Sequence, residues 1–357
     1  MNERAKKFPR WLIPAVLTAT AVLVILFLLQ LLFLPKYMSD IPEGAMIAEY
    51  YEETTEHEVI FVGDCEVYEN FSPITLYENY GITSYIRGSA QQLVWQSYYL
   101  LEDTLRYETP KVVVFNVLAL KYDEPQSEAY NRMTIDGMKW SSSKIGAIRA
   151  SMTEDENFLD YLFPILRYHS RWSDLSGEDV SYLFSRDKVT HNGYYMRVDT
   201  KPVDSFPEPD VLADYTLGST AMSYLDRMRT LCEENGIELV LVKSPSLYPY
   251  WYDEWDAQIA EYADEYGLYY FNYIDLADDV GIDYSSDPYD AGLHLNLSGA
   301  EKLSDYFGAW LSETFDLTDY RENAEYRTVY AEKISFYEEM EAAQYQELEE
   351  YGEIVSY

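Results

Sequence analysis

Four short apolar runs, alternating with stretches of helical character, constrain the fold of this chain most strongly. They lie at residues 59–62, 111–117, 238–243 and 268–273. Continuous apolar runs of this length are typical of parallel strands that are buried on both faces, because helices between the strands cover the sheet. The sequence therefore predicts an α/β fold, a three-layer α/β/α sandwich with a mostly parallel sheet.

The expected helices precede the later strands, at residues 90–106, at 219–234 and in a stretch that closes at Gly267. The second of these helices is followed by Asn235-Gly236, a usual signal for the end of a helix. The order of elements is thus that of a doubly wound sheet.

A long uncharged stretch, residues 11–35, follows the basic residues Arg4, Lys6, Lys7 and Arg10. A helix needs about 20 apolar residues to cross the hydrocarbon core of a bilayer, so this stretch is expected to be a transmembrane anchor. Basic residues mark the cytoplasmic side. We therefore expect residues 1–10 to be cytoplasmic, and the main domain to lie outside a cell membrane that the chain crosses once.

A cleaved signal peptide is the competing interpretation of the same stretch. The apolar core of a signal peptide usually has about 7–15 residues and ends in a small-residue cleavage site. Neither condition is well met here, which favours the anchor.

The formal net charge of −37 argues against a nucleic-acid partner, because the phosphate backbone requires a basic patch. It also argues against tight docking on anionic lipid or polymer without bridging cations. An excess of carboxylates is otherwise typical of a well-solvated surface.

Cysteine is sparse, with only Cys65 and Cys232 in the chain, so no disulfide framework is indicated. Cys65 directly follows a predicted strand, whereas Cys232 sits near the end of a helix that leads into one. In a doubly wound sheet these positions lie at opposite edges, and we expect no bridge between them.

The alternation of strands and helices lapses between residues 121 and 214, a segment rich in Trp, Tyr, Arg and Ser. A connection of this length inside a compact domain is usually functional, so we expect a cap-like insertion over the α/β domain of residues 59–315. A structural insertion that only covers one sheet face is the alternative. Residues 36–58 form an acidic connector, and residues 316–357 an acidic helical tail expected to be a solvent-exposed extension.

The motif VIFVGDCEVY places Gly63, Asp64 and Cys65 where the first strand ends and the chain must turn. In open α/β sheets, ligands bind beyond the carboxyl ends of the strands. A thiol at this position would be a nucleophile if a base lowered its pKa. A buried, unreactive thiol is the alternative.

The segment DPYDAGLHLNLSGAEKL places Asp290 four residues before His294, ahead of a helix. Ser298 and Glu301 fit a capping box that would hold the preceding loop. A histidine that is oriented by a carboxylate is the general-base half of a catalytic triad. A structural histidine or a metal ligand is the alternative, although a metal site would need further ligands nearby.

Together these motifs resemble the SGNH/GDSL hydrolases: a Gly-Asp-nucleophile turn after the first strand, a glycine in the next block, an Asn after a later strand, and an Asp-His pair near the carboxyl end. The resemblance covers residues 59–315. More narrowly, the pattern is similar to membrane-anchored SGNH-like proteins that work beside membrane-bound O-acyltransferases on surface polysaccharides.

The resemblance implies a nucleophilic role for Cys65, where the family normally has serine, with His294 as base and Asp290 as its orienting acid. It also implies that Gly88 and Asn116 line the oxyanion hole. Asp287 is an alternative partner for His294, because the Asp-His spacing is one residue longer than usual. Neither a metal nor an organic cofactor is implied.

Three further residues, Arg132, Lys139 and Trp140, suit the binding of a sugar or a carboxylated acyl group. The leading hypothesis is an extracytoplasmic esterase or O-acyltransferase that acts on a cell-surface glycan. The alternative is a catalytically degenerate scaffold that binds a glycan or a membrane O-acyltransferase. A third hypothesis is a structural surface protein whose carboxylates are bridged by cations.

Overall fold

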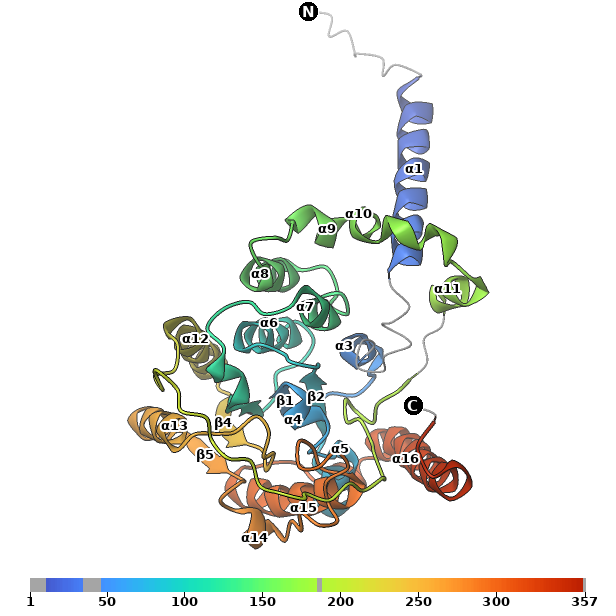
Figure 1. The fold of residues 1–357 in the computed structure, drawn as a ribbon. Coiled ribbons are helices and arrows are strands. Elements are labelled where there is room, and N and C mark those ends of the chain that lie inside the picture. Colours follow the sequence, from blue (N-terminus) through green and yellow to red (C-terminus); the bar gives the residue numbers. More distant parts are fainter. Residues whose placement is uncertain (1–10, 35–45, 185–187, 356–357) are drawn as a thin grey trace, which may run out of the picture. The chain divides into compact units, whose positions relative to one another are not determined.

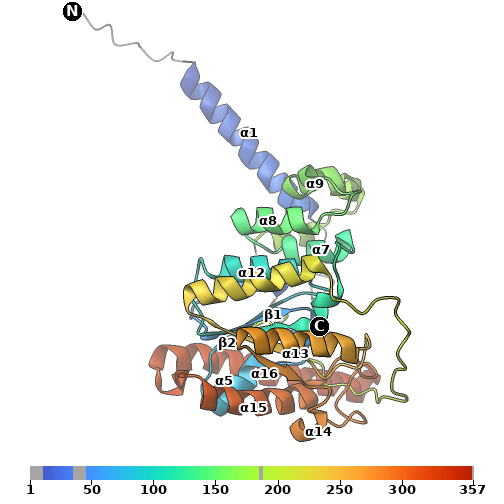
Figure 2. The ribbon, with the colours of Figure 1, turned by 90° about the vertical axis from the view of Figure 1, so that its left-hand side faces the viewer.

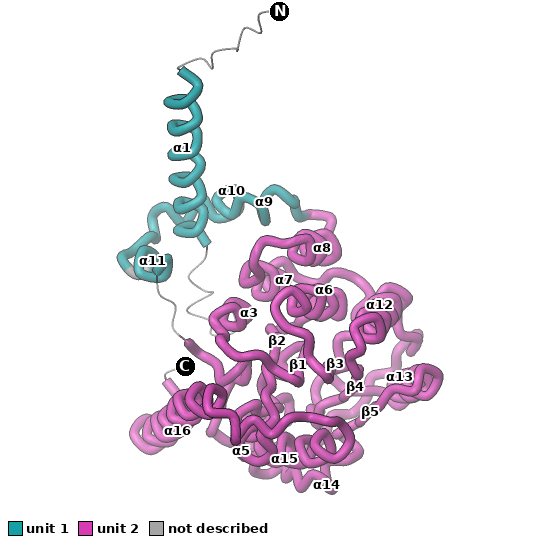
Figure 3. Tube along the Cα trace, turned by 180° about the vertical axis from the view of Figure 1, so that it is seen from behind, with its two compact units in different colours: residues 1–40, 156–187 teal, residues 41–155, 188–357 magenta. Residues whose placement is uncertain are grey.

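A computed structural model describes residues 11–34, 46–184 and 188–355 of the chain. The chain divides into two compact units, residues 1–40 with 156–187 and residues 41–155 with 188–357 (Figure 3). The predicted cytoplasmic segment, residues 1–10, and residues 36–45 of the predicted connector lie outside the described residues. The predicted insertion is divided between the units, because its residues 156–187 belong with the amino-terminal helix.

The larger unit contains a five-stranded sheet in the order β2-β1-β3-β4-β5, and every neighbouring pair of strands is parallel. This is the flavodoxin-like order of doubly wound folds. The predicted α/β sandwich with a parallel sheet is confirmed. The strands are β1 (Val59–Gly63), β2 (Ser84–Gly88), β3 (Val112–Asn116), β4 (Glu238–Lys243) and β5 (Tyr269–Asn272).

Alternate side chains of the central strands serve two separate cores, because successive strand residues point to opposite faces. Phe61 belongs to one core, and Ile60 and Val62 belong to the other. Figure 2 shows α12 above the strands and α5, α15 and α16 below them. The helices that cover the face of Ile60 and Val62 are α6 (Val94–Thr104), α12 (Ser219–Asn235) and α13 (Asp253–Tyr266). The helices that cover the face of Phe61 are α4 (Cys65–Tyr68), α5 (Pro73–Tyr80), α15 (Leu297–Thr314) and α16 (Ala324–Tyr351).

Strand β2 was not among the predicted strands, since its sequence has no continuous apolar run. It carries Arg87, which is 1% exposed. The guanidinium lies 3.4 Å from the Asp103 carboxylate and 4.1 Å from the centre of the Tyr50 ring. A buried ion pair with an aromatic neighbour thus takes the place of an aliphatic residue in this strand.

Helix α16 forms the predicted helical tail, but the expectation of a solvent-exposed extension is wrong. Tyr330 is fully buried, and its ring stacks on Tyr77 with 3.7 Å between ring centres. Farther along the helix, Tyr337 is hydrogen-bonded to Ser72, and Gln344 donates to the Met196 carbonyl oxygen. The tail is therefore part of the body, and two tyrosines are the most deeply buried apolar residues of its inner face.

The remaining elements of the larger unit connect the sheet and its helices. Figure 1 labels most of them along the chain. They are α3 (Met46–Glu49), η2 (Tyr50–Glu52), η3 (Val117–Lys121), α7 (Glu128–Ile135), α8 (Ser142–Ser151), α14 (Ala277–Val280) and η5 (Tyr320–Glu322).

The smaller unit contains α1 (Leu12–Phe33), a helix of 22 residues that is long and apolar enough to cross a membrane. Arg171 donates to the carbonyl oxygens of Phe33 and Leu34 at the end of α1, where the last carbonyls of a helix have no partner within it. The other elements of this unit are α9 (Phe158–Leu162), α10 (Pro164–Tyr168), η4 (His169–Ser173) and α11 (Gly177–Tyr182).

Candidate functional site

The turn after β1 requires glycine at its first position. Gly63 has a φ of +157°, and a Cβ there would lie 2.4 Å from Cγ2 of Val67. The next residue, Asp64, caps α4 by accepting a hydrogen bond from the backbone N–H of Glu66 at 3.2 Å. Cys65 is consequently the first residue of a helix at the carboxyl end of a central strand, and its side chain is partly exposed.

The loop before α15 orients His294 through Asp290. One carboxylate oxygen of Asp290 lies 2.7 Å from Nδ1 of His294, and the other accepts from the backbone N–H of the same histidine at 2.8 Å. The Tyr289 ring stacks on the imidazole with 5.9 Å between ring centres. These contacts leave Nε2 as the nitrogen available for other chemistry.

Asn70 joins the segment that begins at Cys65 to the loop that carries His294. Its side-chain oxygen accepts from the backbone N–H of Leu295 at 2.8 Å, and its amide donates to Ser246 at 3.1 Å. The residue is fully buried. Segments about 225 residues apart in the chain are therefore held together beside the end of β4.

Cys65 and His294 interact with each other through their side chains, and each changes the pKa of the other. Burial raises the pKa of the Cys65 thiol to about 11, and the nearby imidazole works in the opposite direction. Burial would lower the pKa of His294, but Glu69, Cys65 and Asp290 together hold it well above its ordinary value. Nε2 of His294 is buried and has no partner of full hydrogen-bond geometry among the described residues.

Glu69 is a second carboxylate on the histidine, and the sequence analysis did not identify it. One of its oxygens lies 3.4 Å from Nδ1 of His294 and accepts a hydrogen bond from the Tyr289 hydroxyl. Its position one helical turn after Cys65 is the signal that could have found it, because residues four apart share a helix face.

Asp287, the alternative partner for His294, has other contacts. Its carboxylate accepts from Lys302 at 2.7 Å and from Ser298 at 3.1 Å. The predicted capping box is wrong, because Asn296 caps α15 by accepting from Gly299, and Glu301 instead accepts from the Tyr337 hydroxyl. Asp287 nevertheless steadies the loop, since its bond to Ser298 ties the loop to the first turn of α15.

A buried ion pair lies behind Cys65. Lys243, at the end of β4, is 2.9 Å from both carboxylate oxygens of Glu66, and neither side chain is exposed. The Ser244 hydroxyl donates to the backbone carbonyl of Glu66 at 2.7 Å. The residue that follows Cys65 is thus held at both its side chain and its backbone.

Asn116 belongs to this buried network. Its side-chain amide donates to Glu66 and to Ser244, both at 3.0 Å, and its oxygen accepts from the N–H of Leu118. An amide group has two hydrogens to donate. The structure therefore does not leave Asn116 the free donor that an oxyanion hole requires, and in this arrangement it supports α4 instead.

Gly88 lies beside the turn that carries the thiol. It pairs with Gly63 across the sheet, and a Cβ on it would be 3.1 Å from the Gly63 carbonyl oxygen and 3.2 Å from the Tyr68 ring. The close approach of two backbones explains a glycine at this position.

The three predicted substrate-binding residues are not brought together with Cys65 and His294 by any contact in the described part of the chain. Arg132 is buried and pairs with Glu128 and Asp136, two carboxylates of its own helical stretch. Lys139 lies over the Tyr51 ring, and the ring of Trp140, 48% exposed, has Lys144 above it. The contacts assign Arg132 a structural role.

A pocket of about 530 Å³ opens at the carboxyl ends of β4 and β5, the edge of the sheet that also carries Cys65. Its wall combines aromatic rings with carboxylates and one amide. The residues that define it are Phe206, Tyr250, Trp251, Asp253, Asp256, Asn272 and Asp275. Leu247, another lining residue, donates its N–H to the carbonyl of Gly292, which places the pocket next to the histidine loop.

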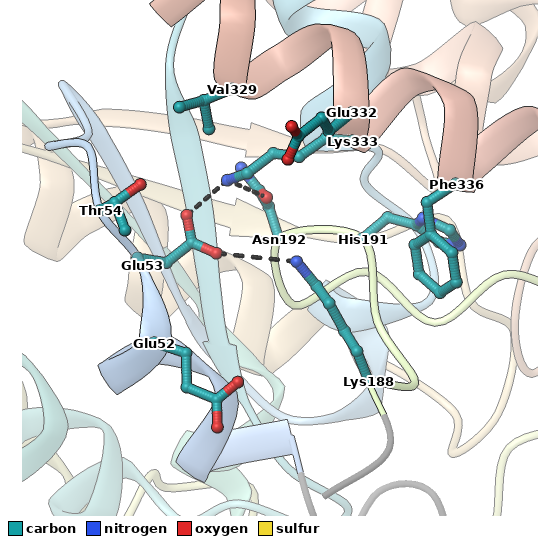
Figure 4. A pocket seen from close by; sticks show the side chains of 10 residues that line it. All are labelled: Glu52, Glu53, Thr54, Lys188, His191, Asn192, Val329, Glu332, Lys333 and Phe336. Atoms are coloured by element: carbon teal, nitrogen blue, oxygen red, sulfur yellow. Dashed lines mark hydrogen bonds and ion pairs between the residues drawn. The ribbon is translucent and has the colours of Figure 1, made fainter. Parts of the chain in front are cut away.

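A separate pocket of about 270 Å³ lies between η2, residues 188–192 and α16. Glu53 links Lys333 and Lys188 across it, and Lys333 also donates to Asn192 (Figure 4). Both ring nitrogens of His191 are buried and have no hydrogen-bond partner among the residues that the structure describes, and burial lowers the pKa of this histidine to about 3. The ion pairs of Glu53 with Lys333 and Lys188 join η2 to α16 and to the segment of residues 188–192.

Among the described residues, no group of three or more His, Cys, Asp and Glu side chains could hold a metal ion. No protein-family model matches the chain, and no curated protein is detectably similar in sequence. Among solved structures, the chain is similar to a GDSL-like lipase from Bacteroides thetaiotaomicron, at 11% identity and a TM-score of 0.35. The match covers 75% of this chain and 95% of the lipase chain.

Proposed function

We propose that this protein is an extracytoplasmic, SGNH-like esterase or O-acyltransferase that uses Cys65, His294 and Asp290. The observation that carries the proposal is the 2.7 Å contact between Asp290 and Nδ1 of His294, on an imidazole that also interacts with the Cys65 thiol. A nucleophile, a base and an orienting carboxylate in this order are the elements of acyl transfer.

In the proposed reaction, Nε2 of neutral His294 takes the proton of the Cys65 thiol as the sulfur attacks the ester carbonyl. The tetrahedral intermediate collapses when the C–O bond breaks, and the imidazolium returns the proton to the leaving alcohol. Water or a sugar hydroxyl then attacks the thioester, with His294 again accepting the proton; the C–S bond breaks, and the imidazolium returns the proton to the Cys65 thiolate. The step needs no oxidant, metal or cofactor, since only a proton and an acyl group change place.

The Gly88 backbone N–H is the proposed donor to the developing oxyanion. Stabilisation of this charge is usually the largest single contribution to catalysis of acyl transfer, and one lost donor typically costs about 10²–10³ in rate. Because the Asn116 amide is occupied by Glu66 and Ser244, we do not retain it in the oxyanion hole.

A cell-surface glycan is the proposed acyl carrier. The pocket beyond β4 and β5 offers Tyr250 and Phe206 as aromatic surfaces, and Asp253 and Asp275 as acceptors for hydroxyl groups. Aromatic side chains present a large apolar face, and carboxylates accept several hydrogen bonds. A ring that bears hydroxyl groups on its edge and C–H groups on its face fits both.

The anchor is proposed to be α1, with the basic amino terminus in the cytoplasm and the body outside the cell. Its length and composition suit a single membrane crossing. A membrane-bound O-acyltransferase is the proposed partner, because such an enzyme would place acyl groups within reach of a body tethered to the same membrane.

The test is hydrolysis of an aryl ester and of acylated surface polysaccharide by the wild-type protein and by Cys65→Ala. We expect turnover by the wild type and its loss in the variant. Turnover that survives in Cys65→Ala would remove this thiol from the mechanism. In parallel, alkylation should be faster at Cys65 than at the buried Cys232, and slower in His294→Ala.

A non-catalytic scaffold that binds a glycan or an acyltransferase is the second candidate. The occupied amide of Asn116 and the raised pKa of the Cys65 thiol favour this candidate, because the first removes a donor from the oxyanion hole and the second lowers the fraction of reactive thiolate. It predicts retention of acylated polysaccharide without turnover, with equal affinity in the wild type and in Cys65→Ala.

A further inference from the structure

Helices α10 and η4 pack against the carboxyl end of α1, within the smaller unit (Figure 3). The Ile165 N–H donates to the side-chain oxygen of Gln30 at 3.3 Å. Arg171 donates to the Phe33 carbonyl oxygen at 3.2 Å, and the Trp172 ring stacks on Phe33 with 6.3 Å between ring centres. Backbone, guanidinium and ring contacts thus fix this part of the predicted insertion to the last residues of α1.

The length of α1 sets the level at which these elements lie. Its 22 residues extend over about 33 Å at about 1.5 Å per residue, close to the hydrocarbon thickness of about 30 Å. The side chains of residues 13–28 are exposed, and partial burial begins at Leu29. If α1 crosses a membrane, α10 and η4 therefore lie where the acyl chains meet the headgroups.

A set of large apolar side chains is exposed in the same segment, and we call this set the exposed patch. Its members, 37–72% exposed, are Leu159, Leu162, Phe163, Leu166 and Trp172. The first four have the spacing of one helix face, whereas Tyr161 and Tyr168, on the opposite side of that pattern, are buried. An apolar face turned outward is the reverse of what a helix on a soluble body shows, and such a patch marks a membrane or protein interface.

The charge of this segment suits a lipid surface. The whole chain has a formal net charge of −37, but residues 158–173 contain two arginines and one aspartate. The segment is therefore not repelled by phosphate headgroups. Arginine together with exposed Leu, Phe and Trp is the composition of segments that lie in a membrane interface.

We propose that α9, α10 and η4 form a membrane-interface segment, which inserts the exposed patch into the boundary between headgroups and acyl chains of the leaflet at the carboxyl end of α1. The proposal rests on the proposed role of α1 as the anchor, and it goes beyond that role because it gives the protein a second contact with the bilayer. Lipid is favoured over a protein partner because the elements that carry the exposed patch are held at the end of a helix that acyl chains would surround.

The experiment measures the depth of a fluorophore in phosphatidylcholine vesicles that contain the full-length protein. Leu166→Cys is introduced together with Cys65→Ala, so that the fluorophore reacts with the new thiol while Cys232 stays buried. Spin-labelled lipids carry the quencher either near the headgroup or near the chain ends. We expect the shallow quencher to lower the fluorescence by about half and the deep quencher to lower it less, since interfacial helices lie at the headgroup boundary. Leu159→Cys gives the same measurement if Leu166→Cys fails to fold.

Two further positions are the controls. A fluorophore at Glu349→Cys, an exposed site among the carboxylates of α16, should not be quenched at either depth, because ionised groups stay in water. A fluorophore at Leu23→Cys, in the middle of α1, should be quenched most strongly by the deep spin label.

Failure of this proposal and failure of the anchor give different results. Deep quenching at residue 23 without quenching at residue 166 would keep the anchor and overturn the membrane-interface segment; a blue-shifted but unquenched fluorophore at residue 166 would overturn it in favour of a protein contact. Absence of quenching at residue 23 would remove the anchor. Equal quenching at residues 166 and 349 would be unspecific and would also contradict the proposal.

Discussion

Lys243 lies 2.9 Å from both carboxylate oxygens of Glu66, and neither side chain reaches solvent. Replacement of one member of such a pair strands the other charge in the interior. We expect Lys243→Met to lower the free energy of unfolding by about 3–5 kcal/mol, as measured by urea denaturation. Arg321→Met, which breaks the exposed pair with Asp319, should cost less than about 1 kcal/mol. Equal losses in the two variants would contradict this account.

Asp64 gives the folded state a pH dependence of predictable sign. Burial, and then the charge of Glu66, raise its pKa from 3.8 to about 7. Between these values the folded protein binds a proton that the unfolded chain has released, so stability from this group falls as pH rises from about 4 to 7. Urea denaturation at several pH values should show that the free energy of unfolding of Asp64→Asn falls less over this interval than that of the wild type. The free energy of unfolding of the exposed variant Asp316→Asn should depend on pH as it does in the wild type.

Substitution of Asp290 should lower activity, whereas substitution of Asp287 should lower stability. Asp290→Asn removes the charge next to Nδ1 of His294, and we expect kcat/KM on an aryl ester to fall by about 10²–10⁴. Asp287→Asn leaves His294 untouched but weakens the bonds from Lys302 and Ser298. It should cost about 1–3 kcal/mol of stability with little change in kcat/KM. The opposite pattern would make Asp287 the orienting acid.

Tyr330 tests the contribution of α16 to the core. Its ring is fully buried against Tyr77, so Tyr330→Ala should destabilise the protein by about 3–5 kcal/mol. Tyr345→Ala, on the same helix but 51% exposed, should change stability by no more than about 0.5 kcal/mol. Thermal or urea unfolding of both variants gives the comparison.

The proposed membrane orientation can be checked by protease protection. If α1 is the anchor, protease added to intact cells should remove an epitope tag placed after residue 355 and spare a tag placed before residue 1. Protection of both tags would place the body inside the cell.

Patterns of apolar residues within single segments were sufficient to predict four of the five strands. Apolar runs identified β1, β3 and β4, because buried parallel strands are apolar throughout, and the aromatic run of the partly exposed edge strand β5 was identified in the same way. Strand β2 was missed because Arg87 interrupts its pattern and is stabilised by Asp103, a residue 16 positions away. No local rule anticipates that pairing.

The same distinction applies to the candidate site. Cys65 and His294 could be singled out from turn and loop motifs, and the structure brings them together. The bridge that Asn70 makes to Leu295 joins residues 225 positions apart, so periodicity gives no sign of it. For Asn116, the sequence shows a strand-end amide but not that Glu66 and Ser244 already occupy it.

The packing of α16 has a consequence for biosynthesis. Tyr77 is made early, yet the ring that covers it, Tyr330, leaves the ribosome more than 250 residues later. During that interval one side of the nascent core stays open to solvent or to a chaperone, since domains emerge amino-terminal end first. A nascent chain whose Tyr330 is still inside the ribosome therefore lacks part of its core, and this face of the sheet is completed only at the end of synthesis.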